Sequence, residues 1–148
     1  GLLVPAEPRR LATLPYHAYH PLGLEQRRAD VLRRIGVLAA RLEASLAEGP
    51  EQARARLQAV AGIGPWTAAE ATRIALGDPD AVSVGDFHLP SLVAFTLAGE
   101  AQADDARMLE LLEPYRGQRA RVVRLLELGG RSRARRAPRM AARTIERL

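Results

Sequence analysis

The chain has no cysteine and no lysine. Without cysteine it can form no disulfide bond, hold no cysteine-ligated zinc or iron–sulfur cluster and use no thiol nucleophile. Without lysine it has no side-chain amine that can form a Schiff base with a substrate. These two absences exclude several enzyme classes before any motif is considered.

Aromatic residues and long apolar runs are also scarce. Aromatic residues supply 4% of the 148 residues, whereas hydrophobic residues together supply 47%, so we expect an aliphatic core. No apolar run approaches the roughly 20 residues that a membrane-spanning helix needs, and the first residues show no secretory signal pattern. We therefore expect one globular domain, or part of one, in the cytoplasm and with no membrane partner.

The positive charge is distributed unevenly along the chain. Residues 116–148 contain 11 arginines against two glutamates, a net charge of +9, whereas residues 1–115 carry a net charge of −4. A basic end on an acidic body favours binding to a polyanion such as DNA. An arginine-rich composition with a solvated tail explains the same pattern without any partner, and both interpretations stay open.

Apolar residues recur at spacings of three and four, and signals for strands are almost absent. This periodicity, with glycine and proline at the expected ends, predicts helices over 24–47, 50–60, 65–76, about 90–97, 104 or 105 to 112 or 113, and 116–128. We predict an all-α fold with short loops. It comprises an irregular N-terminal arm (1–21), a helical core (22–130) and an arginine-rich tail (131–148).

Residues 57–68 read as a helix, a very tight turn and a second helix. Gly62 and Gly64 can adopt backbone angles that other residues disfavour, and without a side chain they leave room for a ligand to approach the backbone closely. Pro65 suits the first position of a helix. The amides of this turn, with the hydroxyl of Thr67, are placed to bind one phosphate of DNA without reading its sequence. An ordinary helix–turn–helix corner, with glycines that serve packing, is the alternative.

Asp86 follows Ser83 and Gly85 at the start of a predicted helix. The helix dipole and amide hydrogen bonds lower the pKa of a carboxyl group in such a position, so we expect Asp86 to be ionised at neutral pH. An ionised carboxylate can stabilise positive charge on a sugar or help a water molecule to attack. A plain helix N-cap is the alternative.

Two motifs together resemble a known family. Gly-Ile-Gly-Pro-Trp-Thr-Ala at 62–68 and Val-Gly-Asp-Phe-His-Leu at 84–89 resemble the helix-hairpin-helix/Gly-Pro-Asp superfamily of DNA glycosylases, in particular its AlkA-like branch of DNA-3-methyladenine glycosylases of type II. The resemblance spans roughly residues 22–130 and implies the helix-hairpin-helix glycosylase fold. We expect the chain to correspond to the C-terminal half of such an enzyme, with the N-terminal part absent.

The resemblance implies a role for each matching residue. Asp86 stands at the essential aspartate, and Gly62 and Gly64 stand at the glycines that grip the phosphate beside the lesion. Trp66 stands where strand-cutting relatives carry a catalytic lysine, which implies a glycosylase without a lyase step. In this branch that Trp lines the pocket for the flipped base; a core indole is the alternative. On the last predicted helix, Arg116 and Arg119 are expected to face DNA, although a solvated helix face explains them equally well.

The implied reaction is the first step of base-excision DNA repair. The damaged nucleotide is rotated out of the duplex, and the N-glycosidic bond of its alkylated purine is hydrolysed. The chemistry needs no metal or other cofactor, and the resemblance allows a monovalent cation at the hairpin carbonyls when DNA is bound. The partner is double-stranded DNA, which would keep the protein at the bacterial nucleoid, and we expect a monomer. A non-catalytic helix-hairpin-helix DNA-binding module and a helical protein–protein module are the other hypotheses.

Overall fold

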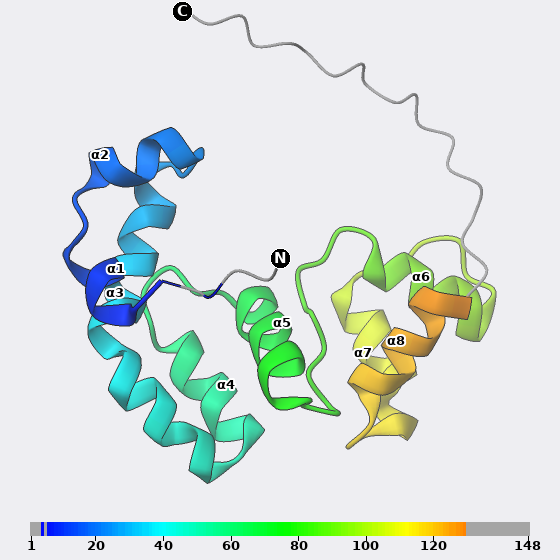
Figure 1. The fold of residues 1–148 in the computed structure, drawn as a ribbon. Coiled ribbons are helices and arrows are strands. Elements are labelled where there is room, and N and C mark those ends of the chain that lie inside the picture. Colours follow the sequence, from blue (N-terminus) through cyan, green and yellow to red (C-terminus); the bar gives the residue numbers. More distant parts are fainter. Residues whose placement is uncertain (1–3, 5, 130–148) are drawn as a thin grey trace, which may run out of the picture.

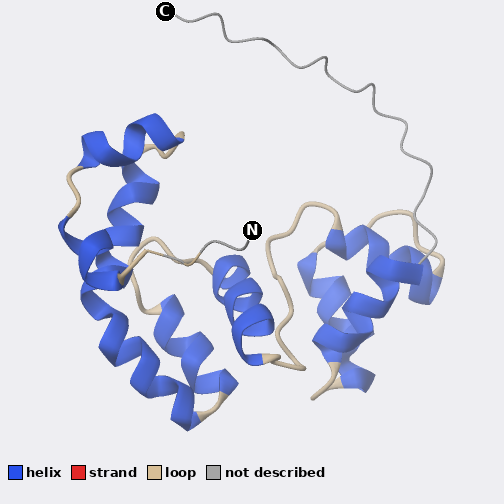
Figure 2. Ribbon diagram, viewed as in Figure 1, coloured by secondary structure: helices blue, strands red, loops and turns tan. Residues whose placement is uncertain are grey.

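The computed structural model describes residue 4 and residues 6–129, and the regular secondary structure of these residues is entirely helical (Figure 1). They form eight α-helices and three short 3₁₀ helices, and no strand occurs among them (Figure 2). The predicted all-α class is therefore confirmed for this part of the chain. No helix in it is long and apolar enough to cross a membrane. The predicted arginine-rich tail lies outside the described residues.

The helices gather into two lobes. The hairpin lobe contains α1 (Pro8–Thr13), α2 (Tyr16–Tyr19), α3 (Gln26–Ala44), α4 (Pro50–Gln58) and α5 (Pro65–Leu76), with 3₁₀ helices η1 (His20–Leu22) and η2 (Ser45–Glu48). The C-terminal lobe contains α6 (Leu89–Ala98), α7 (Asp105–Leu112), η3 (Glu113–Tyr115) and α8 (Arg119–Gly129). In the first lobe α1 packs on α3 and α4 on α5, and in the second α6 packs on α7 and α8. A connecting segment, residues 77–88, joins the two lobes.

The N-terminal arm is not irregular, as the sequence suggested, but helical. Helix α1 lies against α3 at Gly36, where an added Cβ would come within 2.5 Å of the Pro8 carbonyl oxygen and 2.7 Å of the Ala12 nitrogen. The buried Tyr19 donates its hydroxyl to the carbonyl of Leu11 at 2.6 Å. The prediction of an irregular arm was wrong because this close backbone approach has no signal in the sequence. Glycine inside a helix indicates a less stable helix, and its role in the contact between α1 and α3 cannot be read from the sequence.

The predicted helix bounds differ from the observed ones mainly at the ends. Helix α5 spans the predicted residues, whereas the first long helix ends at Ala44 and continues as a 3₁₀ turn. Helix α7 begins at Asp105, within the predicted bounds, and Asp104 caps it by accepting a hydrogen bond from the Arg107 amide at 2.9 Å. Helix α8 begins three residues later than predicted, because Gly117 adopts a φ of +86° that a helix does not allow.

Each lobe has its own aliphatic core, as the composition predicted. In the hairpin lobe the buried residues Val60, Ile63 and Ala68 pack against apolar side chains of α3 and α4. The buried core of the C-terminal lobe is formed by larger side chains, namely Leu89, Val93, Met108, Leu112 and Val123. Burial of these faces is what holds each set of helices together, because the hydrophobic gain scales with the apolar area removed from water.

Two aspartates of the connecting segment fasten it to the lobes. Asp78 pairs with Arg54 of α4. Asp80 accepts hydrogen bonds from the amides of Gly117 and Arg119, at 2.8 and 3.0 Å, and forms an ion pair with the Arg119 guanidinium. The hydrogen bond from the Arg119 side chain has the largest effect on the pKa of Asp80. Together with the bonds from the backbone amides it outweighs partial burial, so the pKa of Asp80 is lowered. The start of α8 is thereby tied to the turn that follows α5.

Candidate active site

The two glycines of the hairpin turn have different local reasons to be glycine. Gly62 has a φ of +97°, and a Cβ added to it would lie 2.4 Å from Cγ2 of Val31 on α3. Gly64 has an extended backbone, with φ −90° and ψ 174°, and a Cβ there would meet no atom within 4 Å. Gly62 is therefore fixed by packing and by its backbone angle, whereas the open side of Gly64 faces away from the protein.

The start of α5 is open to a ligand. Gly64, Pro65 and Thr67 are exposed, and no side chain caps the helix. The first amides of an α-helix have no partner inside the helix, so they can bind an anion, and the helix dipole favours negative charge there. On the other side of the turn, the carbonyl of Ala61 accepts a hydrogen bond from the Arg34 guanidinium at 2.9 Å.

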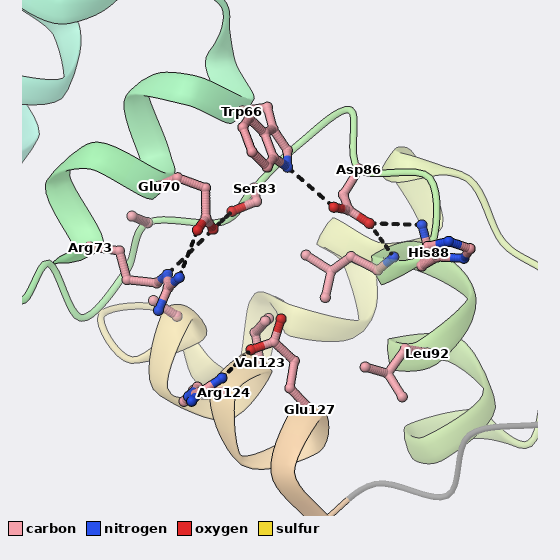
Figure 3. A pocket seen from close by; sticks show the side chains of 13 residues that line it. Trp66, Glu70, Arg73, Ser83, Asp86, His88, Leu92, Val123, Arg124 and Glu127 are labelled. Carbon is pink, nitrogen blue, oxygen red and sulfur yellow. Dashed lines mark hydrogen bonds and ion pairs between the residues drawn. The ribbon is translucent and has the colours of Figure 1, made fainter. Parts of the chain in front are cut away.

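Asp86 lies directly beside this helix start. Its Oδ1 accepts the backbone amides of His88 and Leu89 at 2.7 and 2.9 Å, and its Oδ2 accepts the indole N–H of Trp66 at 3.2 Å (Figure 3). Partial burial acts to raise the pKa of Asp86. The two amides and the indole outweigh it, so the pKa is lowered and the carboxylate is ionised at neutral pH.

The backbone before Asp86 is held from the C-terminal lobe. The amide of Gly85, a residue with a φ of +90°, donates to Oδ2 of Asp105 at 3.0 Å. Because Asp105 is the first residue of α7, this bond ties the segment that carries Asp86 to a helix of the second lobe. The carboxylate is thus held by α5 from one side and by α6 and α7 from the other.

Asp86 and Trp66 line a pocket of about 250 Å³ between the two lobes (Figure 3). Trp66 belongs to α5 and is 44% exposed, and the opposite wall comes from α6 and α8. The pocket is lined by both polar and apolar residues, namely Trp66, Glu70, Arg73, Ala81, Ser83, Asp86, His88, Leu89, Leu92, Ala120, Val123, Arg124 and Glu127. The structure therefore brings the predicted catalytic residue and the predicted base-stacking residue to one cavity.

Sequence reasoning missed a second carboxylate in this pocket. Glu70 accepts hydrogen bonds from Arg73 at 2.6 Å and from the Ser83 hydroxyl at 2.5 Å. The Arg73 hydrogen bond is the largest cause of a lowered pKa for Glu70. Glu70 follows Trp66 by four residues, so the two side chains share one face of α5. That spacing was the available signal, since both residues bind the connecting segment from this face.

Arg116 and Arg119, predicted to face DNA, do not line the pocket. The Arg119 side chain is 18% exposed and is bound to Asp80, and Arg116 pairs with Glu113 at 2.6 Å. On the same helix Arg124 pairs with Glu127. Much of the positive charge of α8 is therefore neutralised within the protein, and the DNA contact of Arg116 and Arg119 stays a prediction.

No group of three or more His, Asp or Glu side chains that could hold a metal ion occurs among the described residues.

No protein-family model matches the chain, and neither a curated protein nor a solved structure gives a significant match.

Proposed function

We propose that this protein is a monofunctional DNA glycosylase that hydrolyses the N-glycosidic bond of alkylated purines in duplex DNA. One observation carries the proposal: the indole of Trp66, in the first turn of α5, donates to the half-buried carboxylate of Asp86 at 3.2 Å. The uncapped amides after the glycine turn and the ionised carboxylate are therefore neighbours. A strand whose phosphate binds those amides would bring an adjacent deoxyribose towards Asp86.

The main contribution that this reaction needs from the protein is a negative charge beside the sugar. When the bond between C1′ and the alkylated purine breaks, the base leaves with the bonding electron pair and becomes neutral. Positive charge then develops on the sugar. Water adds to C1′ and loses a proton, which leaves an abasic site. The ionised Asp86 can stabilise the charged sugar or orient the water, and the donors that hold it are in place before the reaction begins.

Trp66 gives the pocket its affinity for a flipped base in this proposal. Its hydrogen bond to Asp86 fixes the edge of the ring, while 44% of the residue is exposed. An indole face attracts cationic ligands, and alkylation makes a purine cationic. With no lysine in the chain, no Schiff base to the opened sugar can form on a lysine side chain, so strand cleavage by that route is not expected.

The test is base release from a duplex that carries one methylated purine, measured for the wild type and for Asp86→Asn. We expect the substitution to lower the single-turnover rate about 100-fold or more, with DNA affinity changed only a few-fold. Asparagine keeps one oxygen that can accept the amides of His88 and Leu89, so the loop should stay in place. Asp104→Asn is the matched control, because it removes the same charge at the N-cap of α7 and leaves the pocket alone.

Three outcomes would count against the proposal. Equal rates for Asp86→Asn and the wild type would mean that the carboxylate takes no part in the reaction. A wild type that binds duplex DNA but releases no base would favour the non-catalytic DNA-binding module. Absence of any salt-dependent binding to DNA would leave the protein–protein module.

A further inference from the structure

The arginines of the described residues fall into two groups. Nine form ion pairs with carboxylates, among them Arg116, Arg119 and Arg124 of the α8 region. The others have no described carboxylate within 4.0 Å, and they are Arg9, Arg10, Arg27, Arg34, Arg41 and Arg121. Five of these six belong to α1 and α3, so the unneutralised arginines of the described residues lie mainly in the hairpin lobe.

Three of these cations, Arg27, Arg34 and Arg41, form a row along α3, which we call the arginine row. They are seven residues apart and all exposed. Seven residues make nearly two helical turns, so the three side chains leave the same face of α3 at steps of about 10 Å. The two acids nearest in sequence to Arg27 and Arg34 are already used, because Glu25 pairs with Arg28 and Asp30 with Arg33.

The arginine row borders the hairpin along its length. Arg27 lines a groove together with Gly62 and Thr67. Arg34 donates to the Ala61 carbonyl and lines the adjoining hollow with residues 59–61. Arg41 lines a third hollow that also reaches residues 59 and 60. Between the first two arginines, Val31 packs against Gly62, which fixes the position of the row relative to the turn.

We propose that the arginine row is a track for the phosphodiester backbone of DNA that extends the phosphate site of the hairpin turn. The inference rests on the DNA-binding part of the proposed function. Guanidinium groups bind phosphate oxygens through paired N–H donors, and exposed cations that no carboxylate neutralises keep their full charge for a polyanion. Arg34 uses one nitrogen on Ala61, which leaves its other N–H groups available. The track adds α3 to the DNA surface.

The test compares the salt dependence of binding to an unmodified duplex, measured by fluorescence anisotropy between about 50 and 300 mM NaCl. Each phosphate contact contributes about 0.9 to the slope of log K against log salt. The variant Arg27→Gln/Arg41→Gln should lower that slope by about 1.8, from the same constant. Arg34 is left unchanged here because it also supports the hairpin.

Arg107→Gln is the control, because it removes the same charge from an arginine that is paired with Glu100 and Glu110 and has no predicted contact with DNA. We expect its slope to stay within about 0.5 of the wild-type slope, below one phosphate contact. Arg27→Lys should keep most of the slope, since the contact depends on charge. Thermal unfolding of the double variant should match the wild type, because neither side chain is bound to another described residue.

The inference is overturned if the double variant keeps the wild-type slope, or if Arg107→Gln lowers the slope as much as the double variant does. Unchanged base release together with an unchanged slope would reject the track alone and leave the proposed function standing. A wild type without salt-dependent DNA binding would reject both. Salt-dependent binding of polyglutamate, with none of DNA, would assign the row to an acidic protein partner and overturn the inference.

Discussion

The two lobes differ in how far their described arginines are neutralised: five of ten in the hairpin lobe have no described carboxylate partner, against one of five, Arg121, in the C-terminal lobe. In the C-terminal lobe Arg107, Arg116, Arg119 and Arg124 are each bound to carboxylates, so their charge serves the fold. In the hairpin lobe the arginine row has no described carboxylate partner and borders the glycine turn. Counting charge along the sequence places the excess at the C-terminal end, whereas pairing in space decides which cations remain available to a ligand.

The lobes also differ in how their helices are held together. The hairpin lobe depends on close backbone approach: Gly36 lies against α1, Gly62 lies against α3, and small residues such as Ala53 and Ala68 are fully buried. The C-terminal lobe depends on large side chains, since Met108 and Leu112 have no exposed surface and an added Cβ at Gly99 or Gly117 would meet nothing within 4 Å. Substitutions that add atoms at Gly36 or Gly62 should therefore destabilise the hairpin lobe. Substitutions that remove buried atoms should destabilise the C-terminal lobe.

The largest expected effect is a loss of atoms from the second core. Met108→Ala leaves a cavity where the side chain was fully buried, so we expect the free energy of unfolding to fall by about 3 kcal/mol. Urea denaturation followed by circular dichroism measures it. Leu125→Ala on α8 is the control, because that residue is 68% exposed and should cost less than about 0.5 kcal/mol. Similar losses for both would show that this core is not the source of the lobe's stability.

The converse change adds one methyl group to the hairpin lobe. Gly62→Ala places a Cβ 2.4 Å from Val31 at a φ of +97°, and we expect a loss of about 2 kcal/mol from crowding and backbone strain together. In the background Val31→Ala the same substitution should cost less, because the crowding is gone while the strain remains. An equal cost in both backgrounds would mean that contact with α3 plays no part in fixing this glycine.

Much of the fold could be predicted because its signals are local. Gly49 with Pro50, Gly64 with Pro65 and Gly77 mark the helix ends that the structure has, and Asp104 caps α7, the helix that was predicted to begin at residue 104 or 105. The N-terminal arm could not be predicted in this way. Its helices are short, and α1 is fixed by the space above Gly36, which becomes visible only when α1 and α3 lie together.

The candidate site was predictable where two short motifs carry it and not where distant residues meet. Trp66 and Asp86 come from the two motifs, and the structure joins them by one hydrogen bond. Neither the support from Asp105 to Gly85 nor the pairing of Arg119 with Asp80 has a signal in the sequence, because the partners are 20 and 39 residues apart. Six of the ten described ion pairs join residues three apart, such as Glu113 with Arg116, so helical spacing was an available signal for those paired arginines.

A smaller effect tests the ion pairing of the C-terminal lobe. The lowered pKa of Asp80 means that its stabilising contribution is complete above the pKa of the unfolded chain and is lost as pH falls through the folded value. We expect Asp80→Asn to destabilise the protein by about 1 kcal/mol at pH 7. The difference should shrink below about pH 4, where the wild-type carboxylate also becomes protonated. Denaturation series at pH 7 and pH 3 measure it, and a gap that is constant with pH would contradict an electrostatic role.

The smallest expected change in stability is also the most direct probe of the hairpin turn. Gly64→Ala keeps an allowed backbone and meets no atom within 4 Å, so we expect the free energy of unfolding to change by less than about 0.5 kcal/mol. The new methyl group would nevertheless stand on the open side of the turn, where the proposed phosphate approaches. We therefore expect DNA affinity to fall several-fold at constant salt while the melting temperature stays the same. Gly62→Ala is expected to lower stability as well as DNA affinity. Only Gly64→Ala therefore separates the role of glycine in the fold of this turn from its role in binding phosphate. If its affinity for DNA is unchanged, the backbone at Gly64 does not contact the strand, and the turn serves only to join α4 to α5.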